Sequence, residues 1–242
     1  MQAFRTIRIV LVETSHPGNI GAAARAMKTM GLARLYLVRP KYFPDARAVA
    51  RATGAEGTLN SAIVCDSLDE ALRDTIFTIG TSARPRSLPW PGLDARAAAD
   101  RLMVESGTGE CALVFGRERS GLTNEELARC HYAATIPCNA RFGSLNLAAA
   151  VQVFCYELLM RVQISPATEA TQSEDMPAPA QELEAFYAHL EATLIALNFL
   201  NPTRPRHLMH RLRRLFNRAR PTRNEVNILR GILTATGARP PA

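Results

Sequence analysis

Two short apolar runs in the middle of this chain each lead directly into a loop of glycine and small polar residues. The run Ala112–Phe115 is followed by Gly116 and Gly121, and the run Ala133–Pro137 is followed by the sequence Gly143-Ser-Leu-Asn146. Short apolar runs of this kind, each followed by a helical segment, are typical of buried parallel strands. Because α/β sheets hold ligands in the loops at the carboxyl ends of their strands, the two loops predict a site that binds a small molecule largely through backbone groups.

The same alternation of strand and helix patterns covers the first two thirds of the chain. Further β-rich apolar runs lie at Ile7–Val12, Arg34–Val38, Ala62–Cys65 and Thr75–Ile79, and helical patterns separate them. This order predicts an α/β fold in which helices cover a parallel sheet.

Local signals mark several of the expected helix ends. Ser67–Glu70, Thr123–Glu126 and Thr222–Glu225 fit the capping box, in which Ser or Thr and a Glu three residues later exchange hydrogen bonds with the backbone. Gly31 and Gly54 fall where two of the helices would end.

The chain changes in composition after residue 163. Residues 164–181 hold three acidic side chains and no basic or aromatic ones, which is typical of an exposed linker. We therefore expect an α/β domain at 1–163, a flexible linker at 164–181 and a small all-helical extension at 182–242. The helices expected in the extension are Glu182–Leu200, Arg206–Ala219 and Glu225–Ala235.

Positive charge concentrates in this extension. The whole chain has a net charge of +7, and residues 181–242 contribute ten basic and four acidic side chains. Residues 203–223 include eight arginines and no acid. Clustered arginine is typical of a surface that contacts nucleic acid, so we expect the extension to do so.

A helix over residues 206–219 would be amphipathic. One face would carry Leu208, Leu212, Leu215 and Ala219 and would pack against the rest of the extension. The opposite face would carry Arg206, His210, Arg213 and Asn217, with Arg214 and Arg218 on its flank. We predict that Arg206, Arg213 and Arg214 contact RNA.

Other features argue against several classes of protein. The five cysteines form no CxxC pair, so we expect buried, reduced thiols and neither a metal site nor disulfides. The apolar stretches are too short to span a bilayer or are interrupted by polar residues, and the N-terminus has no signal-peptide pattern, so we expect a cytoplasmic protein that does not bind membranes. We find no Ser-His-Asp triad, because Ser144 lacks the GxSxG context and we expect His131 to be exposed ahead of its strand.

The loop after the first strand combines glycines with an arginine. Pro17–Gly21 begins a helix that carries Arg25 less than two turns beyond Asn19. A dinucleotide site would require GxGxxG, which is absent, although Arg39 at the end of the second strand leaves an NADP-binding enzyme open. From the residues alone, a turn, a helix cap and a surface arginine are the favoured interpretation.

Taken together, these segments resemble a known family. Val12–Leu32 and the two loop regions within Glu110–Glu157 are similar to motifs 1, 2 and 3 of the SPOUT class of RNA methyltransferases, in its TrmH-like 2'-O-ribose branch. The GTSAR loop at Gly80–Arg84, the LPWP run at Leu88–Pro91 and the C-terminal extension resemble the TrmJ-type tRNA 2'-O-methyltransferases. The resemblance implies the SPOUT fold with a C-terminal trefoil knot, S-adenosylmethionine as cofactor, and a homodimer.

The resemblance also assigns roles to individual residues. Arg25 would lie at the catalytic centre, where we expect a cation that stabilises the developing alkoxide, because guanidinium groups do not readily give up a proton. Ser144 and Asn146 would join it, although a role for Asn146 as helix cap competes with a catalytic one. Asn19 and Arg86 would contact RNA, and the role of Glu118 stays open. The cofactor pocket would be lined by Thr81, Ser82, Ala83, Gly116, Ile136, Gly143, Ser144 and Leu145.

The implied reaction is transfer of the sulfonium methyl group to a ribose 2'-oxygen. Whole-chain resemblance indicates tRNA as the substrate, with the cytidine or uridine at anticodon-loop position 32 as the expected target. Ribosomal RNA is one alternative substrate. A non-catalytic RNA-binding module is another alternative, but the intact glycines and the intact Ser144–Asn146 sequence argue against it.

Overall fold

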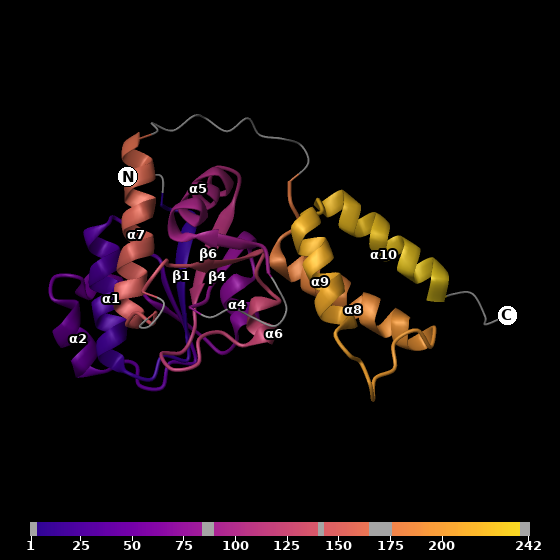
Figure 1. Ribbon diagram of the computed structural model, residues 1–242, viewed down its shortest axis with the longest axis horizontal. Helices are drawn as coiled ribbons and strands as arrows, with labels where there is room; N and C mark the ends of the chain where they lie inside the picture. Colours follow the sequence, from indigo (N-terminus) through magenta and orange to yellow (C-terminus); the bar gives the residue numbers. More distant parts are fainter. Residues whose placement is uncertain (1–3, 84–89, 140–142, 165–175, 238–242) are drawn as a thin grey trace. The chain divides into compact units, whose positions relative to one another are not determined.

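The computed structural model describes residues 4–83, 90–139, 143–164 and 176–237 (Figure 1). The chain divides into two compact units, Met1–Thr171 and Gln172–Ala242, and each is described by itself. The predicted RNA contact Arg86 lies outside the described residues, as does most of the predicted linker.

Unit 1 is built on a seven-stranded sheet with the order β3-β2-β1-β6-β4-β7-β5. Every neighbouring pair of these strands is parallel, as predicted. All six predicted strands are present, while β5, a three-residue edge strand paired with β7, is too short to give a periodic signal and was missed. The strands are β1 (Ile7–Val12), β2 (Leu35–Val38), β3 (Ile63–Cys65), β4 (Thr75–Thr81), β5 (Gly92–Asp94), β6 (Glu110–Phe115) and β7 (Tyr132–Thr135).

Helices cover both faces of this sheet. They are α1 (Pro17–Thr29), α2 (Ala46–Ala52), α3 (Glu56–Asn60), α4 (Leu68–Leu72), α5 (Ala95–Ser106), α6 (Asn124–Leu127) and α7 (Leu147–Ile164). Figure 1 shows α1, α2 and α7 along one side of the sheet and α4 and α6 along the other. Right-handed crossovers explain this division, because connections that run toward opposite edges of a parallel sheet place their helices on opposite faces.

The strand order determines where a ligand can bind. From β1 the chain moves outward to β2 and β3 and then returns to β4, while β6 later enters between β1 and β4. The direction of the connections therefore reverses at the centre of the sheet. Ligands of open α/β sheets bind beyond the carboxyl ends of the strands at such a point.

The core of unit 1 lies between the sheet and the helices α1, α5 and α7. Ile9 and Leu11 of β1 and Leu113 of β6 are fully buried. At the carboxyl end of β6, Phe115 packs edge-on against Phe154 of α7, with 5.7 Å between the ring centroids. This aromatic contact fixes α7 against the end of the strand at which the predicted site begins.

The predicted helix ends are largely confirmed. Gly31 and Gly54 have positive φ angles of 84° and 80° at the ends of their helices. Both reciprocal bonds of the capping box are present at Thr123–Glu126 and at Thr222–Glu225. Ser67 accepts from the backbone N–H of Glu70, but the Glu70 carboxylate accepts from the N–H of Asp66, so this box is displaced by one residue.

Two predictions about single side chains have different outcomes. All five cysteines are free thiols, and only Cys138 is exposed; burial raises the pKa of the Cys130 and Cys155 thiols to about 12. The prediction that His131 is exposed was wrong. Its side chain is buried against β4, where Nδ1 accepts from the N–H of Thr78 at 3.1 Å and the ring lies against Phe77.

In its described residues, unit 2 consists of the helices α8 (Ala180–Ala196), α9 (Leu208–Ala219) and α10 (Arg223–Gly237). Residues 176–178 run beside 221–223, with the N–H of Ala178 donating to the carbonyl of Pro221 at 3.0 Å. The last residues of the predicted flexible linker are therefore part of unit 2. The core of this unit is formed by Leu183, Phe186, Tyr187, Leu190 and Val226, with Met209, Leu212 and Phe216 of α9 packed against it.

The predicted faces of α9 were wrong in part. Leu215 is 46% exposed, whereas Asn217 is buried and accepts from the hydroxyl of Tyr187 at 2.6 Å. Arg213 pairs with Glu184 and lies over the Tyr187 ring, 4.4 Å from its centroid. Polar partners on α8 thus draw Arg213 and Asn217 inward, which the pattern of a single helix does not reveal.

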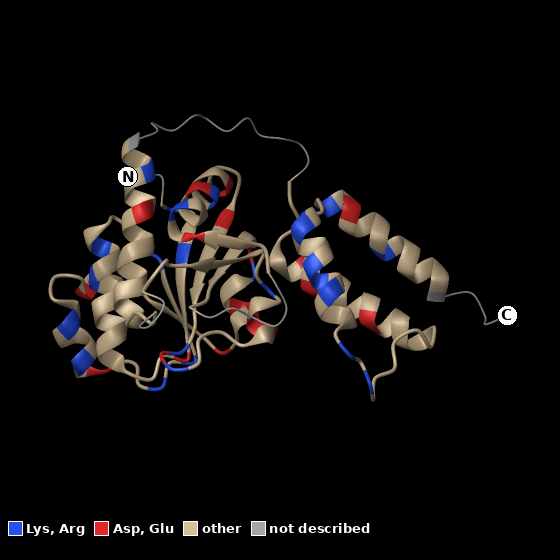
Figure 2. Ribbon diagram, viewed as in Figure 1, with Lys and Arg blue, Asp and Glu red and all other residues tan. Residues whose placement is uncertain are grey.

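A cationic face remains on α9, and it includes the predicted Arg214 and Arg218 but not Arg213. Arg211 and Arg218 are exposed, Arg214 is half-buried on the same side, and the exposed Arg204 and Arg206 precede the helix. Figure 2 shows these basic positions along α9 and in the loop before it. Arg211 therefore takes the place that the sequence pattern assigned to Arg213.

Candidate cofactor-binding site

One pocket brings together all eight residues predicted to line the cofactor site. It has a volume of about 370 Å³, within the range of small-molecule sites, and lies at the carboxyl ends of β4, β6 and β7. Thr81–Ala83 come from the end of β4, Gly116 directly follows β6, Ile136 follows β7, and Gly143–Leu145 lie in the loop before α7.

The loop after β6 lines the pocket and is folded by backbone contacts within itself. The N–H of Gly121 donates to the carbonyl of Arg117 at 2.9 Å, which folds the loop into a tight turn. A Cβ atom on Gly116 would stand 2.1 Å from the carbonyl carbon of Gly121 and 2.2 Å from the nitrogen of Leu122. Since atoms cannot approach so closely, this turn requires glycine at position 116.

Glu118 of the same loop holds the loop after β1. Its carboxylate accepts from the N–H of Ser15 at 3.1 Å, the hydroxyl of Ser15 at 3.0 Å, the N–H of His16 at 3.1 Å and Nδ2 of Asn19 at 3.1 Å. Burial opposes ionisation, but the hydrogen bonds from Ser15 and its neighbours outweigh it and hold the pKa of Glu118 below its ordinary value. The acid whose role the sequence left open therefore connects two loops of the site.

Asn146 extends this connection to the loop before α7. Its Nδ2 donates to Oδ1 of Asn19 at 3.0 Å, while its Oδ1 accepts from the N–H of Ala148 at 2.9 Å and caps the helix. The Asn146 side chain thus caps α7, as predicted, and also binds the side chain of Asn19. Asn19, predicted to contact RNA, has both its amide nitrogen and its oxygen engaged within the protein.

A second open pocket adjoins the first beside this chain of hydrogen bonds. It has a volume of about 490 Å³ and shares Glu118, Arg119, Ser144, Leu145 and Leu147 with the first pocket. Asn19 and Asn146 also line it. The two predicted catalytic residues Ser144 and Asn146 therefore border a place where a second molecule can lie next to a bound cofactor.

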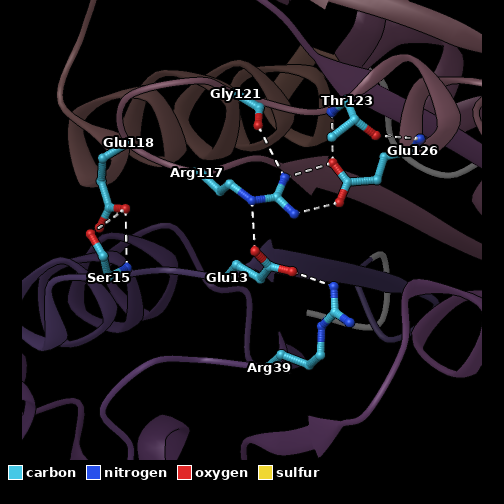
Figure 3. A network of polar contacts seen from close by, with 8 residues as sticks. All are labelled: Glu13, Ser15, Arg39, Arg117, Glu118, Gly121, Thr123 and Glu126. Atoms are coloured by element: carbon cyan, nitrogen blue, oxygen red, sulfur yellow. Dashed lines mark hydrogen bonds and ion pairs between the residues drawn. The ribbon is translucent and has the colours of Figure 1, made fainter.

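An ion-pair network links the loops that follow β1, β2 and β6 (Figure 3). Arg117 donates to both carboxylate oxygens of Glu126 at 3.0 Å and to Glu13 at 2.7 Å. The bonds to Glu126 and then the bond to Glu13 raise the pKa of Arg117. The bond from Arg117 in turn lowers the pKa of Glu13, although burial opposes this shift. Arg39, the residue that kept an NADP-binding enzyme as an alternative, forms an ion pair with Glu13 within the protein.

Arg25 does not line either of these pockets. Its side chain is exposed on α1 and borders a separate pocket together with Arg51 of α2 and Gln152 of α7. The sequence predicted one catalytic centre containing Arg25, Ser144 and Asn146. A single chain brings the last two together and leaves Arg25 apart.

Neither a metal-binding cluster nor a membrane-spanning helix is found in the described ranges. No group of three or more His, Cys, Asp or Glu side chains among them is placed to hold a metal ion. No helix among the described residues is both long and apolar enough to cross a bilayer.

Comparisons with known proteins match nearly the whole chain. The SpoU rRNA Methylase family matches residues 6–156, and the C-terminal domain of the tRNA methyltransferase TrmJ matches residues 181–240. The chain is 54% identical to the tRNA (cytidine/uridine/adenosine-2'-O-)-methyltransferase TrmJ of Pseudomonas aeruginosa strain UCBPP-PA14, over 95% of this chain and 93% of that protein. It is 52% identical to the tRNA (cytidine/uridine-2'-O-)-methyltransferase TrmJ of Escherichia coli strain K12, over 96% and 95%. The crystal structure of TrmJ from Z. mobilis ZM4 superposes with a TM-score of 0.83 at 33% identity, over 94% of this chain and 97% of that one.

Proposed function

The chain belongs to the SpoU rRNA Methylase family, in its TrmJ-type branch, and from this we propose that it transfers a methyl group from S-adenosylmethionine to a ribose 2'-hydroxyl of tRNA. The observation that carries the proposal is the gathering of eight residues from separate loops into one pocket, with an open second pocket beside it. The names of the curated relatives support tRNA over ribosomal RNA as the substrate.

The residues of the first pocket fit S-adenosylmethionine. Ile136 and Leu145 offer apolar surface for an adenine ring, and Gly116 and Gly143 allow the backbone to approach the ligand closely. Ser144 adds a hydroxyl at the boundary with the second pocket. When bound, the cofactor supplies an electrophilic methyl group, so the protein has to provide alignment and to manage the proton of the ribose hydroxyl.

The remaining catalytic group in this proposal is Arg25. Arg25 is exposed and lines neither the cofactor pocket nor the second pocket of its own chain, which we call the acceptor pocket. The proposal therefore requires a homodimer in which Arg25 of a second copy reaches the acceptor pocket. There its guanidinium would stabilise the developing alkoxide and hold a phosphate of the RNA. Ser144 and Asn146 would position the ribose, with Asn146 held in place by Asn19 and Glu118.

The proposal includes the trefoil knot and the division of labour along the chain. The strand order supports the knot, because β6 enters between β1 and β4 and β7 enters between β4 and β5. Unit 2 would add RNA affinity through Arg206, Arg211 and Arg218, all exposed. A tRNA-modifying role would place the protein in the cytoplasm.

The target nucleotide is the cytidine or uridine at anticodon-loop position 32. The test is methyl transfer from labelled S-adenosylmethionine to tRNA transcripts with C, U, A or G at this position, and to ribosomal RNA. A matched tRNA with 2'-deoxyribose at position 32 should accept no methyl group. Transfer to the A transcript would extend the specificity to that in the name of the P. aeruginosa relative.

Two outcomes, one from this assay and one from calorimetry, would contradict the proposal. Methylation of ribosomal RNA but not of tRNA would change the substrate class. Absence of S-adenosylmethionine binding in calorimetry, together with retained RNA binding, would identify a non-catalytic RNA-binding module.

A further inference from the structure

The pocket that contains Arg25 is a separate feature of unit 1. It has a volume of about 390 Å³, lies between α1, α2 and α7, and shares no lining residue with the two pockets described above. Its residues are Ala22, Arg25, Ala26, Thr29, Ala50, Arg51, Thr53 and Gln152. Three alanines thus supply its apolar lining, and two arginines, a glutamine and two threonines supply its polar groups.

A close helix contact brings the two arginines to this pocket. A Cβ atom on Gly21 of α1 would stand 1.9 Å from the carbonyl oxygen of Ala48 of α2, so the two helices touch backbone to backbone at this point. Arg25 follows Gly21 by four residues, and Arg51 follows Ala48 by three. Since residues three or four apart share a helix face, the contact at Gly21 places both guanidiniums beside one pocket.

The positive charge in this pocket is not balanced by carboxylates. Among the residues of unit 1 that the structure describes, nine arginines form an ion pair with an acidic side chain. In the described part of the chain no such pair is found for Arg25 or Arg51, and no acid lines the pocket. Two like charges beside one pocket repel each other, and a bound anion would relieve this repulsion.

The hydrogen-bond donors of the pocket are suited to phosphate. The hydroxyls of Thr29 and Thr53 donate to the carbonyls of Arg25 and Ala50, at 2.8 Å and 3.1 Å. Their protons are therefore used within the helices, and the donors left are the two guanidiniums and the amide of Gln152. Planar guanidinium groups match the oxygens of a phosphate through paired hydrogen bonds.

Arg51 also lies next to the loop that borders the acceptor pocket. A Cβ atom on Gly18, at the start of α1, would stand 3.6 Å from Cγ of Arg51 and 3.1 Å from the imidazole of His16. His16 in turn donates its N–H to Glu118 and lines the acceptor pocket. Arg51 thus lies between the Arg25 pocket and a loop of its own chain that lines one of the two acceptor pockets of the proposed dimer.

We propose that this pocket binds a backbone phosphate of the RNA substrate, with Arg51 as a second cation beside Arg25 and Gln152 as a neutral donor. The assignment rests on the proposed function, since it takes RNA as the source of the phosphate. It adds an RNA-binding residue, Arg51, on a helix outside the three loops of the cofactor site.

The test compares Arg51→Gln with Arg73→Gln in the full-length protein. Arg73 is an exposed arginine at the end of α4, on the other face of the sheet, so its loss removes the same charge elsewhere. We expect Arg51→Gln to weaken tRNA binding about tenfold and to lower the slope of log affinity against log salt by about 0.7–0.9, the value for one phosphate contact. Arg51→Lys should recover part of the affinity, and S-adenosylmethionine binding should be unchanged in all three variants.

A double-mutant cycle with Arg25→Gln tests whether the two arginines share one phosphate. In that case the double variant loses less tRNA affinity than the sum of the two single losses. Strictly additive losses would overturn the shared site, and an Arg51→Gln variant that binds tRNA like Arg73→Gln would overturn the proposal altogether. Failure of the wild-type chain to methylate tRNA would instead contradict the proposed function, so the two failures are distinguishable.

Discussion

Replacing Glu118 with glutamine tests how the three loops of the site are held together. The side chain keeps its size, but one of its two acceptor oxygens becomes an amide donor. If the amide group faces Ser15, the hydroxyl can turn to accept a bond, but the Ser15 N–H loses its partner. If it faces the other way, the N–H of His16 loses its partner, and Asn19 can no longer bond both Glu118 and Asn146 as it does now.

The expected loss of stability follows from these contacts. Each orientation of the glutamine leaves at least one backbone N–H without its present partner, and a hydrogen bond to a charged group contributes about 1.5–3 kcal/mol. Ser15 and His16 are exposed, so water recovers part of this loss. We expect Glu118→Gln to lower the unfolding free energy of unit 1 by about 1–2 kcal/mol, which corresponds to about 2–8 °C in Tm for a unit of this size.

The pH dependence gives a second and more specific signal. The pKa of Glu118 in the folded protein lies below 4.5, the ordinary glutamate value. A lowered pKa stabilises the folded state at pH values above the ordinary pKa, and this stabilisation is lost as the pH falls through the folded-state pKa. The difference in Tm between wild type and Glu118→Gln should therefore be full at pH 7 and should shrink as the pH falls below about 4.5.

Scanning calorimetry of the full-length proteins across this pH range measures both effects, and kcat for tRNA methylation reports on the site. Asp74→Asn, which removes an exposed carboxylate from the loop before β4, is the control and should behave like wild type. If Glu118→Gln has the Tm and pH profile of Asp74→Asn, the carboxylate does not hold the loop after β1.

Three further predictions address the cofactor, the catalytic arginine and the extension. Gly116→Val should weaken S-adenosylmethionine binding in calorimetry at least tenfold, because its Cβ would stand 2.1 Å from the backbone of Gly121. Gly57→Ala, at an open position, should leave the affinity unchanged, and equal affinities for the two variants would show that the cofactor does not bind in this pocket. Arg25→Ala should lower kcat by at least about a hundredfold and leave cofactor affinity nearly intact, and near-normal turnover would exclude its catalytic role. Removal of residues 165–242 should leave a folded, dimeric, cofactor-binding core with weaker RNA binding and a shallower salt slope, whereas equal slopes would leave unit 2 without a role in RNA contact.

The strands were predictable because parallel strands are buried on both faces. Every residue of β1 and β2 is buried, so β2 reads as a continuous apolar run and β1 as an apolar run interrupted only by Arg8. The short edge strand β5 has no such run, and its pairing with β7 depends on tertiary contacts. The burial of His131 had no local signal for the same reason, since its hydrogen bond comes from Thr78 of a neighbouring strand.

The extension shows where the pattern of a single helix fails. The clustering of arginines was evident in the sequence, but the inward face of α9 depends on the residues that α8 presents to it. Glu184 and Tyr187 provide partners for Arg213 and Asn217, so these polar side chains turn inward and Leu215 is left exposed. Side-chain pairing between helices thus overrides the hydrophobic spacing within one helix.

The sequence by itself determined the strands, most helix ends and the composition of the loops, because burial and special backbone angles leave local patterns of apolar residues and glycine. The tertiary structure alone decided which side chains meet. Glu118 reaches Ser15 across about a hundred positions of sequence, and Arg25 and Arg51 line one pocket because α1 and α2 touch at Gly21. Such pairs depend on the order of the strands and the crossing of the helices, and these arise only when the whole chain folds.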